Sequence, residues 1–315
     1  MRLLKWLGIW LVIVSVVFWV GWGVYNNPKT ELISPVLGVS ANMVSDNIWS
    51  PQESSASSNI DLPEITAEAA FFVEANTGVI LYSKNAQLKK PIASLTKIMT
   101  AIIALEHKKF DDIFTVSKRA SEMEPDEMIL LEGEKLNLEE LLSGIFLVSA
   151  NDAAEVLAEQ STLNREVFIA EMNSKAKILG MNKTLFINPT GLEEDDITDP
   201  TKLRVHYSTA YDVALMSRYL ISKWPKVVGI SSSPHIYLPR TETHQDYELY
   251  SGINLLTTYP GVLGLKTGFT PEAGLTLVTL AKRGDLEVIG VLLNSINRRD
   301  DAQKLLDYSF KKLGY

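Results

Sequence analysis

Residues 261–294 read GVLGLKTGFTPEAGLTLVTLAKRGDLEVIGVLLN, and this stretch decides the fold. It contains three runs rich in Val, Leu and Ile, at 261–267, 274–282 and 286–294. Runs of this length that end at turn residues are typical of buried β-strands. Arg283-Gly284-Asp285 separates the last two runs, as the loop of a tight hairpin does. The stretch therefore predicts three consecutive antiparallel strands.

A second hairpin is predicted where the globular part of the sequence begins. AAFFVEANTGVILYSKN (69–85) has two apolar runs around Asn76-Thr77-Gly78. Between the two β regions, apolar residues recur with helical spacing. Strands at both ends with helices between them predict an α+β fold, in which one antiparallel sheet is covered by helices and carries an inserted all-helical lobe. The expected helices span 94–105, about 137–147, 150–160, 164–179 and 208–222, with an amphipathic helix at 299–313 closing the chain.

The composition excludes several classes of function. The 315 residues include 30 Lys and Arg, 38 Asp and Glu and no Cys, which gives a net charge of −8. A nucleic-acid-binding protein needs an excess of basic residues, so nucleic acid is not an expected partner. The lack of Cys excludes a thiol nucleophile, disulfides and thiolate metal sites, and the four scattered His form no HExxH motif. No metal or cofactor is therefore expected.

Residues 1–25 are predicted to form an N-terminal transmembrane anchor. Trp6–Tyr25 is a run of 20 residues without a charge, and a helix of that length spans roughly 30 Å, the thickness of a bilayer core. Arg2 and Lys5 precede the run, so the positive-inside rule places the remainder of the chain outside the cytoplasm. The alternative is a cleaved signal peptide, whose nearest good cleavage site, Val39-Ser40-Ala41, lies far downstream. Either reading predicts an extracytoplasmic domain.

Residues 26–63 are predicted to be a flexible tether, and residues 64–315 the working domain. The tether contains SPVLGVSANMVSDN and SPQESSASSNIDLP, which have no sustained apolar period. A flexible coil of this length spans roughly 30–35 Å. Such a tether holds a domain away from the membrane.

The first chemical motif is Ser94-Leu95-Thr96-Lys97. Residues three apart share one face of a helix, so the Ser94 hydroxyl and the Lys97 amine can meet. A lysine amine accepts a serine proton only when burial or a second cation lowers its pKa. Ser174 and Ser309 also begin SxxK sequences, but each of those lies in an ordinary helix surface pattern. The apolar surroundings of Ser94 and Lys97 single out the first match.

Two further motifs follow in the sequence. Ser149-Ala150-Asn151 opens a predicted helix and could be a simple N-cap. The same pattern at Ser45-Asp46-Asn47 lies in the tether and is interpreted as chance. Lys266-Thr267-Gly268 ends an apolar strand, where a cation and a hydroxyl can hold a carboxylate and a glycine permits close backbone approach. The alternative for this tripeptide is a turn that closes the strand.

The order SxxK, SxN, KTG resembles that of the penicillin-recognising serine enzymes. The longer strings SLTKIMTA, LVSANDAAEVLAE, YSTAYDVA, GLKTGFTPEAG and LLDYSF resemble the D-alanyl-D-alanine carboxypeptidases of low molecular mass. The similarity runs from about residue 64 to residue 315. It implies a β-lactamase/transpeptidase-like fold and a bacterial serine peptidase at the cell membrane.

The resemblance also implies a role for each motif residue. Ser94 would be the nucleophile, Lys97 its base, and Ser149 and Lys266 would relay a proton to the departing D-alanine. Asn151 would hold the substrate amide, while the backbone N–H groups of Ser94 and Phe269 would form the oxyanion hole. Gly268 would permit close approach to the substrate, and Thr267 and Arg298 would bind the terminal carboxylate, although the adjacent Arg299 could replace Arg298.

The implied partners are peptidoglycan stem peptides that end in D-Ala-D-Ala, β-lactam inhibitors and the membrane. Three alternatives remain open at this point. A D,D-endopeptidase of peptidoglycan cross-links would use the same residues. A β-lactamase would need the E-x-x-L-N string, which is absent between Ser149 and Lys266. A non-catalytic wall-binding protein could keep the fold. No function is predicted for residues 229–258.

Overall fold

A computed structural model describes residues 49–53, 61–196, 198–199 and 202–315. The predicted anchor at 1–25 and most of the predicted tether lie outside these residues. Among the described residues, no helix combines the length and the apolar character needed to cross a bilayer.

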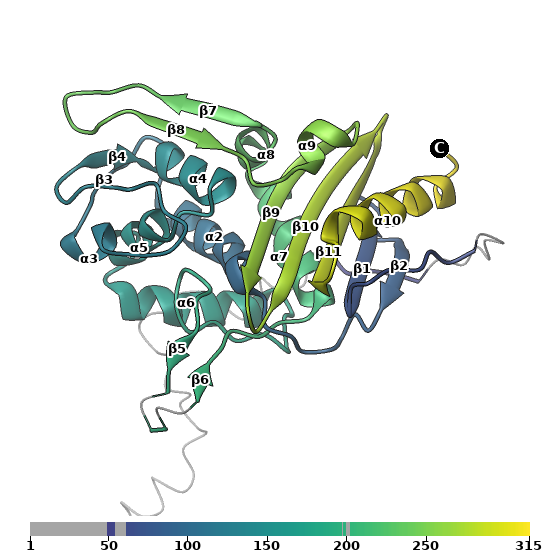
Figure 1. Cartoon of the computed structure of the whole chain (residues 1–315). Helices are drawn as coiled ribbons and strands as arrows, with labels where there is room; N and C mark the ends of the chain where they lie inside the picture. The colour runs from purple at the N-terminus through teal and green to yellow at the C-terminus, as the bar shows by residue number, and fades with distance from the viewer. Residues whose placement is uncertain (1–48, 54–60, 197, 200–201) are drawn as a thin grey trace, which may run out of the picture. The chain divides into compact units, whose positions relative to one another are not determined.

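The centre of the domain is a five-stranded antiparallel sheet (Figure 1). Its order, β2-β1-β11-β10-β9, brings the first hairpin beside the last strand of the chain. The two predicted hairpins and all three predicted C-terminal strands are therefore confirmed. The strands are β1 (Ala69–Glu74), β2 (Ile80–Lys84), β9 (Val262–Thr270), β10 (Gly274–Arg283) and β11 (Leu286–Ser295).

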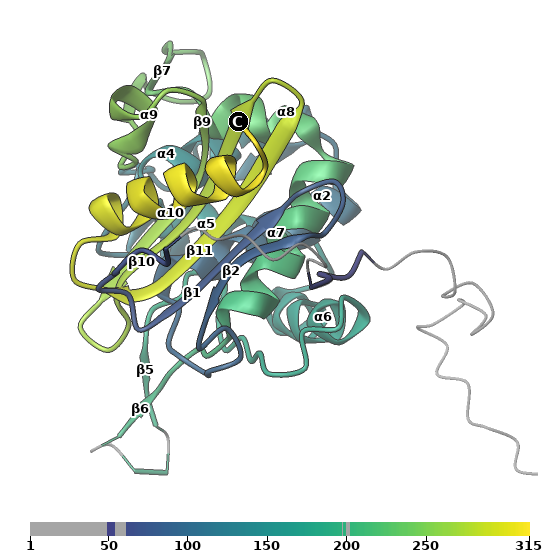
Figure 2. The ribbon, with the colours of Figure 1, turned by 90° about the vertical axis from the view of Figure 1, so that its right-hand side faces the viewer.

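Helices cover both faces of this sheet (Figure 2). Along β1, Ala70 and Phe72 are buried in a core shared with α10 (Arg298–Lys312), while Phe71 and Val73 belong to the larger core on the other face. That second face is covered by α7 (Ala210–Lys223). Burial on both faces explains why the sheet strands read as continuous apolar runs rather than as alternating ones.

The helical lobe forms from the middle of the chain, as predicted. A 3₁₀ helix, η2 (Ala93–Thr96), leads into α2, whose residues are buried from its start to Leu105. The helix starts and ends differ from the predicted ones by one or two residues, except that the first turn of the predicted 94–105 helix is 3₁₀. The helices are α2 (Lys97–His107), α3 (Lys118–Ser121), α4 (Leu138–Leu147), α5 (Asn151–Gln160), α6 (Arg165–Ile178) and α8 (Pro225–Ser231).

Short elements complete the fold, among them the hairpin β7–β8, which extends beside α4 and α8 (Figure 1). This hairpin and α9 occupy the region for which the sequence predicted no function. The edge strand β9 packs against η2, so the edge of the sheet meets the helical lobe there. These elements are β3 (Ile113–Thr115), β4 (Lys135–Asn137), β5 (Glu194–Asp195), β6 (Leu203–Arg204), β7 (His235–Leu238), β8 (Tyr247–Tyr250) and α9 (Leu255–Thr258).

Residues 49–53, within the range predicted as a tether, lie against the turn between β1 and β2. Gln52 N donates to Gly78 O at 2.7 Å, and Ile80 N donates to Gln52 O at 2.9 Å. Trp49 packs against the larger core. The extent of the tether outside these residues stays a prediction.

Candidate active site

Ser94 and Lys97 meet at the start of α2. Lys97 Nζ lies within hydrogen-bond distance of Ser94 Oγ, at 3.0 Å, and donates to the backbone oxygen of Thr190 at 2.8 Å. Lys97 is fully buried and Ser94 is 8% exposed. The predicted side-chain pair is therefore in hydrogen-bond contact, with the serine at the protein surface and the lysine below it.

The surroundings of Lys97 favour its neutral form. Burial, and after it the positive charge of Lys266, hold the pKa of Lys97 well below its usual value, against the opposing charges of Asp126 and Asp152. A neutral amine has a lone pair with which it can accept a proton. Lys97 can therefore act as a base toward Ser94.

Lys266 lies in the edge strand β9 and is 1% exposed. Its Nζ donates to Thr267 O at 2.8 Å. Burial lowers the pKa of Lys266 to about 7, while the charge of Asp126 works in the opposite direction and that of Arg298 in the same one. At neutral pH, Lys266 can thus both hold and release a proton.

Gly268 lets the edge strand approach the nucleophile. A Cβ atom at this position would lie 3.0 Å from Ser94 N and 2.6 Å from Thr276 Oγ1. Only a residue without a side chain leaves that space free. The backbone at KTG therefore does approach its neighbours closely. These neighbours are the Thr276 hydroxyl and the Ser94 backbone nitrogen of the protein itself.

The SxN motif connects α4 to α5. Ser149 adopts the left-handed conformation with φ 64°, and the N-cap of α5 is Ala150, which makes no side-chain capping bond. Ser149 is thus not a simple N-cap. Ser149 Oγ and Asn151 Oδ1 are buried without a hydrogen-bond partner among the described residues, whereas Asn151 Nδ2 donates to Pro125 O. Buried polar atoms normally have partners, so each of these two atoms has unused hydrogen-bonding capacity.

A cavity of about 350 Å³ connects the three motifs. Three predicted residues, Lys97, Asn151 and Lys266, do not line it, because they are buried in the protein interior. Phe269 is 61% exposed at its rim. The other predicted residues line the cavity: Ser94, Ser149, Thr267, Gly268, Phe269 and Arg298.

The structure distinguishes Arg298 from Arg299. Arg298 Nη1 donates to Gly268 O at 2.8 Å and to Thr276 O at 3.1 Å, so the guanidinium is fixed against β9 and β10. Arg298 lines the cavity that contains Ser94, whereas Arg299 is exposed and does not. Arg298 is therefore the cation that a carboxylate in this cavity would meet.

Sequence reasoning missed five residues of the cavity wall. Asp126 is the one carboxylate among them, and its backbone oxygen accepts from Asn151 N at 2.7 Å. Leu147 and Val148 directly precede the SxN motif, whereas no motif points to the other three, which reach the cavity through tertiary contacts. The five residues are Asp126, Leu147, Val148, Tyr250 and Gly252.

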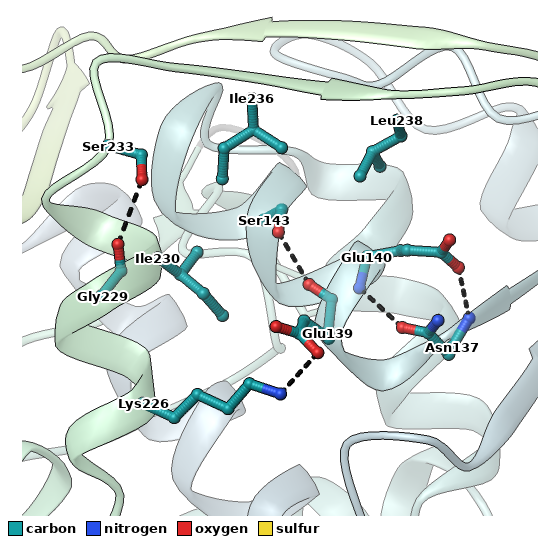
Figure 3. A pocket seen from close by; sticks show the side chains of 10 residues that line it. All are labelled: Asn137, Glu139, Glu140, Ser143, Lys226, Gly229, Ile230, Ser233, Ile236 and Leu238. Carbon is teal, nitrogen blue, oxygen red and sulfur yellow. Dashed lines mark hydrogen bonds and ion pairs between the residues drawn. The ribbon is translucent and has the colours of Figure 1, made fainter.

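A larger cavity of about 470 Å³ lies between α4, α8 and β7 (Figure 3). Its polar groups are already paired with one another. Glu139 contacts Lys226 at 2.6 Å, and Asn137 and Glu140 form a reciprocal capping box at the start of α4. Size alone therefore does not identify the site, since this cavity contains no activated nucleophile. Across the described part of the chain, no cluster of three or more His, Asp or Glu could hold a metal ion.

Comparison with protein families and curated proteins agrees with this geometry. A family model described as D-alanyl-D-alanine carboxypeptidase matches residues 53–297. D-alanyl-D-alanine carboxypeptidase DacF of Bacillus subtilis is 35% identical over 254 residues, which cover 78% of this chain and 62% of that protein. A D-alanyl-D-alanine endopeptidase of Pseudomonas aeruginosa is 32% identical over 220 residues, which cover 68% of this chain and 67% of that protein. The chain thus spans less than two thirds of the length of DacF.

Solved structures share the fold across the described domain. Penicillin-binding protein D2 of Listeria monocytogenes, in its ampicillin-bound form, matches with a TM-score of 0.67 and 34% identity, over 78% of this chain and 98% of that one. The DD-transpeptidase of Streptomyces K15 matches with a TM-score of 0.73 and 29% identity, over 80% of this chain and 100% of that one. The predicted α+β architecture is confirmed by these matches.

Proposed function

Because the chain belongs to the D-alanyl-D-alanine carboxypeptidase family of serine peptidases, we propose that it removes the terminal D-alanine from peptidoglycan stem peptides. The contact that carries this proposal is the 3.0 Å approach of Lys97 Nζ to Ser94 Oγ at the floor of a cavity. A buried amine beside a partly exposed serine supplies both a base and a nucleophile. Each step of the proposed reaction is assigned to a residue of this chain.

Acylation begins when Lys97 accepts the Ser94 proton. Ser94 Oγ then forms a bond to the carbonyl carbon of the penultimate D-alanine, and the amide bond to the last D-alanine breaks. The proton held by Lys97 passes to the departing amine by way of Ser149 and Lys266, so free D-alanine leaves and Lys97 is again able to accept a proton. The Lys266 pKa of about 7 fits this transfer, because a group with a pKa near the working pH exchanges protons efficiently.

Deacylation repeats the chemistry with water as the nucleophile. Water attacks the acyl-enzyme ester, its proton passes to Lys97, and Ser94 regains a proton as the shortened peptide leaves. The backbone N–H groups of Ser94 and Phe269 hold the oxyanion in both halves of the reaction. One such donor is commonly worth about 3–4 kcal/mol.

Substrate binding uses residues that line the cavity and one buried residue. Arg298 and Thr267 line the cavity and bind the terminal carboxylate, and the buried Asn151 binds the substrate amide. Two backbone oxygens hold the Arg298 guanidinium in place, so it is already oriented when a carboxylate binds. β-Lactams, which mimic the D-Ala-D-Ala end, acylate Ser94 by the same route.

A second candidate is D,D-endopeptidase activity on peptidoglycan cross-links. The observation that favours it is the similarity to the Pseudomonas aeruginosa endopeptidase at 32% identity. The two activities break the same type of bond and differ in whether the leaving amine belongs to free D-alanine or to a second stem peptide. They therefore share the nucleophile and its base.

We also propose that the protein is anchored in the membrane by its N-terminal residues. Residues 1–25 anchor the protein as a single transmembrane helix, residues 26–63 form a tether of which 49–53 lie against the domain, and residues 64–315 work outside the cytoplasm. The uncharged run Trp6–Tyr25 and the preceding Arg2 and Lys5 support this arrangement. Cell fractionation checks it: removal of residues 1–25 should release the protein from the membrane fraction, and an unchanged distribution would contradict the anchor.

The test of the activity uses the full-length chain in detergent and a diacyl-Lys-D-Ala-D-Ala tripeptide. Free D-alanine is followed for the wild type and for Ser94→Ala. Release by the wild type alone supports the reaction and the nucleophile. A folded wild type that releases no D-alanine but cleaves a cross-linked dimer is an endopeptidase, and one that does neither excludes both candidates.

A further inference from the structure

One turn of the chain touches both members of the Ser94–Lys97 pair. Thr190 O accepts from Lys97 Nζ at 2.8 Å. At Gly191, which has φ 92°, a Cβ atom would lie 2.1 Å from Ala93 O and 3.1 Å from Ser94 N. The turn is therefore pressed against the backbone of the nucleophile while its carbonyl oxygen holds the base.

The side chain of Asn188 organises this turn. Its Oδ1 accepts from Thr190 N at 3.1 Å, from Thr190 Oγ1 at 3.0 Å and from Gly191 N at 2.9 Å. Its Nδ2 donates to Leu192 O and to Glu194 Oε1, both at 2.9 Å. Asn188 is 3% exposed. A single amide thus fixes the backbone on both sides of the Thr190 carbonyl.

His206 fixes the orientation of that amide. Its Nε2 lies 3.0 Å from Asn188 Oδ1, and its Nδ1 accepts from Ile187 N at 3.3 Å. Since Nδ1 is an acceptor, the proton of the neutral ring is on Nε2, where it donates to Asn188. Burial lowers the pKa of His206 to about 3, so the ring keeps this form at all working pH values.

We propose that Asn188 and His206 are positioning residues for Lys97. They hold the Thr190 carbonyl where it takes one N–H of the Lys97 amine, which turns the amine lone pair toward Ser94. The inference rests on the proposed function, in which Lys97 is the base. A neutral amine on a flexible stem otherwise rotates freely, and a loss of alignment slows proton transfer without changing how substrate binds.

The chain offers a matched control for this role. Asn173 fixes the same segment two residues before Asn188, because its side chain donates to Phe186 O at 2.8 Å and accepts from Phe186 N at 3.0 Å. Among the described residues, Asn173 makes its side-chain hydrogen bonds with Ile169 and Phe186 and none with the 188–191 turn. Asn173→Ala therefore removes comparable hydrogen bonds without releasing the Thr190 carbonyl.

The experiment measures acylation of the full-length protein in detergent by a fluorescent penicillin. Stopped-flow traces separate the dissociation constant of the initial complex from the rate constant of acylation, and thermal unfolding is recorded for each variant. Asn188→Ala should lower the acylation rate constant roughly 10- to 100-fold with the dissociation constant unchanged within about twofold. Asn173→Ala should lower the unfolding temperature but leave the rate constant near that of the wild type.

His206→Phe is a second variant that keeps a ring against Phe186, whose centroid lies 6.4 Å away, and removes the hydrogen bonds of the imidazole with Asn188, Ile187 and the Leu192 backbone. It should lower the acylation rate constant by a smaller factor, roughly 3- to 10-fold. It also keeps the inference testable if Asn188→Ala does not fold.

The possible results distinguish a failure of the positioning role from a failure of the proposed function. Equal losses of acylation rate in the Asn188 and Asn173 variants, or losses confined to the dissociation constant, would overturn the positioning role. Unchanged rates in both Asn188→Ala and His206→Phe would do the same. Failure of the wild type to be acylated, or full acylation of Lys97→Met, would instead count against the proposed function itself.

Discussion

Gly268 lies so close to Ser94 that a methyl group on its α-carbon would sit 3.0 Å from the Ser94 backbone nitrogen. Ser94 is in the 3₁₀ helix η2 and Gly268 is in the edge strand β9, far apart in the sequence. Their approach brings the backbone after Gly268 next to the nucleophile. The geometry proposed for the oxyanion hole depends on this one contact.

Gly268→Ala should therefore lower the rate constant of acylation strongly, with only a small loss in the free energy of unfolding. The new methyl group must displace either Thr276 Oγ1, 2.6 Å away, or the Ser94 backbone. A displacement of about 1 Å at a reacting group costs on the order of 10²-fold in rate. The measurement is the second-order rate constant for acylation by a penicillin. A variant that reacts at the wild-type rate would show that the strand spacing is not critical.

Lys266→Met should make the protein more stable at acidic pH while it abolishes peptidase activity. The folded-state pKa of Lys266 is about 7, against 10.5 for the free side chain. Between these values the unfolded chain binds a proton that the folded chain does not, so the free energy of unfolding rises with pH across that window. Below about pH 7 both states are protonated, and the folded wild type bears the full cost of a buried charge.

The stability gain of Lys266→Met should thus be largest near pH 6 and should vanish as pH approaches about 10.5. Thermal unfolding at several pH values measures it, and a domain of this size gains about 2–4 °C per kcal/mol. Lys282→Met is the matched control, because Lys282 is an exposed lysine in the neighbouring strand whose pKa is raised. A difference between Lys266→Met and wild type that does not vary with pH would contradict the depressed pKa.

Ser149→Ala should lower the rate of acylation while it leaves the free energy of unfolding nearly unchanged. The Ser149 hydroxyl is buried without a hydrogen-bond partner in the described part of the chain, so its removal should change the free energy of unfolding by less than about 0.5 kcal/mol. Acylation should fall roughly 10²- to 10³-fold if the hydroxyl carries a proton. Ser143→Ala provides the comparison, because Ser143 Oγ donates to Glu139 O at 2.8 Å and lies outside the cavity of Ser94.

That control should lose a little stability and no activity. Chemical denaturation and penicillin acylation, measured on both variants, make the comparison complete. If Ser149→Ala reacts as fast as Ser143→Ala, Ser149 has no part in proton transfer.

Arg298→Gln should weaken recognition of the terminal carboxylate, whereas Arg299→Gln should not. A hydrogen bond to a charged group is worth about 1.5–3 kcal/mol, which corresponds to roughly a 10- to 150-fold change. The sharpest readout is the ratio of kcat/KM for a peptide ending in a free carboxylate to that for the same peptide ending in an amide. The ratio should collapse in Arg298→Gln alone. A collapse in Arg299→Gln would reassign the carboxylate site.

Much of the fold could be predicted because its signals are local. The strand β11 and the hairpin turn before it are visible in consecutive residues, and so are the helices with their 3.6-residue spacing. Even there, tertiary contacts changed details: Ser94 lies in a 3₁₀ turn rather than in the first turn of an α-helix, where η2 packs against β9. Ser149 likewise has a left-handed backbone instead of the geometry of an N-cap.

The site was only partly predictable, because several of its determinants come from distant segments. Thr190 and Lys97 are 93 residues apart in the chain, and no local sequence pattern around either residue predicts their hydrogen bond. Asp126 reaches the cavity wall from a loop and Tyr250 from the end of β8, and no motif marks either residue. The dipeptide steps in Asn188-Pro189-Thr190-Gly191 do signal a turn, but they do not say what the turn will touch.

The sequence by itself determined which side chains are available and how strands and helices alternate, since both depend on residue type and short-range spacing. It also indicated that Ser94 and Lys97 share one helix face. Only the tertiary structure lowers the pKa of Lys97, because that shift depends on complete burial and on the charge of Lys266 from another element. Reactivity of this kind arises from the removal of water and the placement of distant charges, and only the folded chain supplies both.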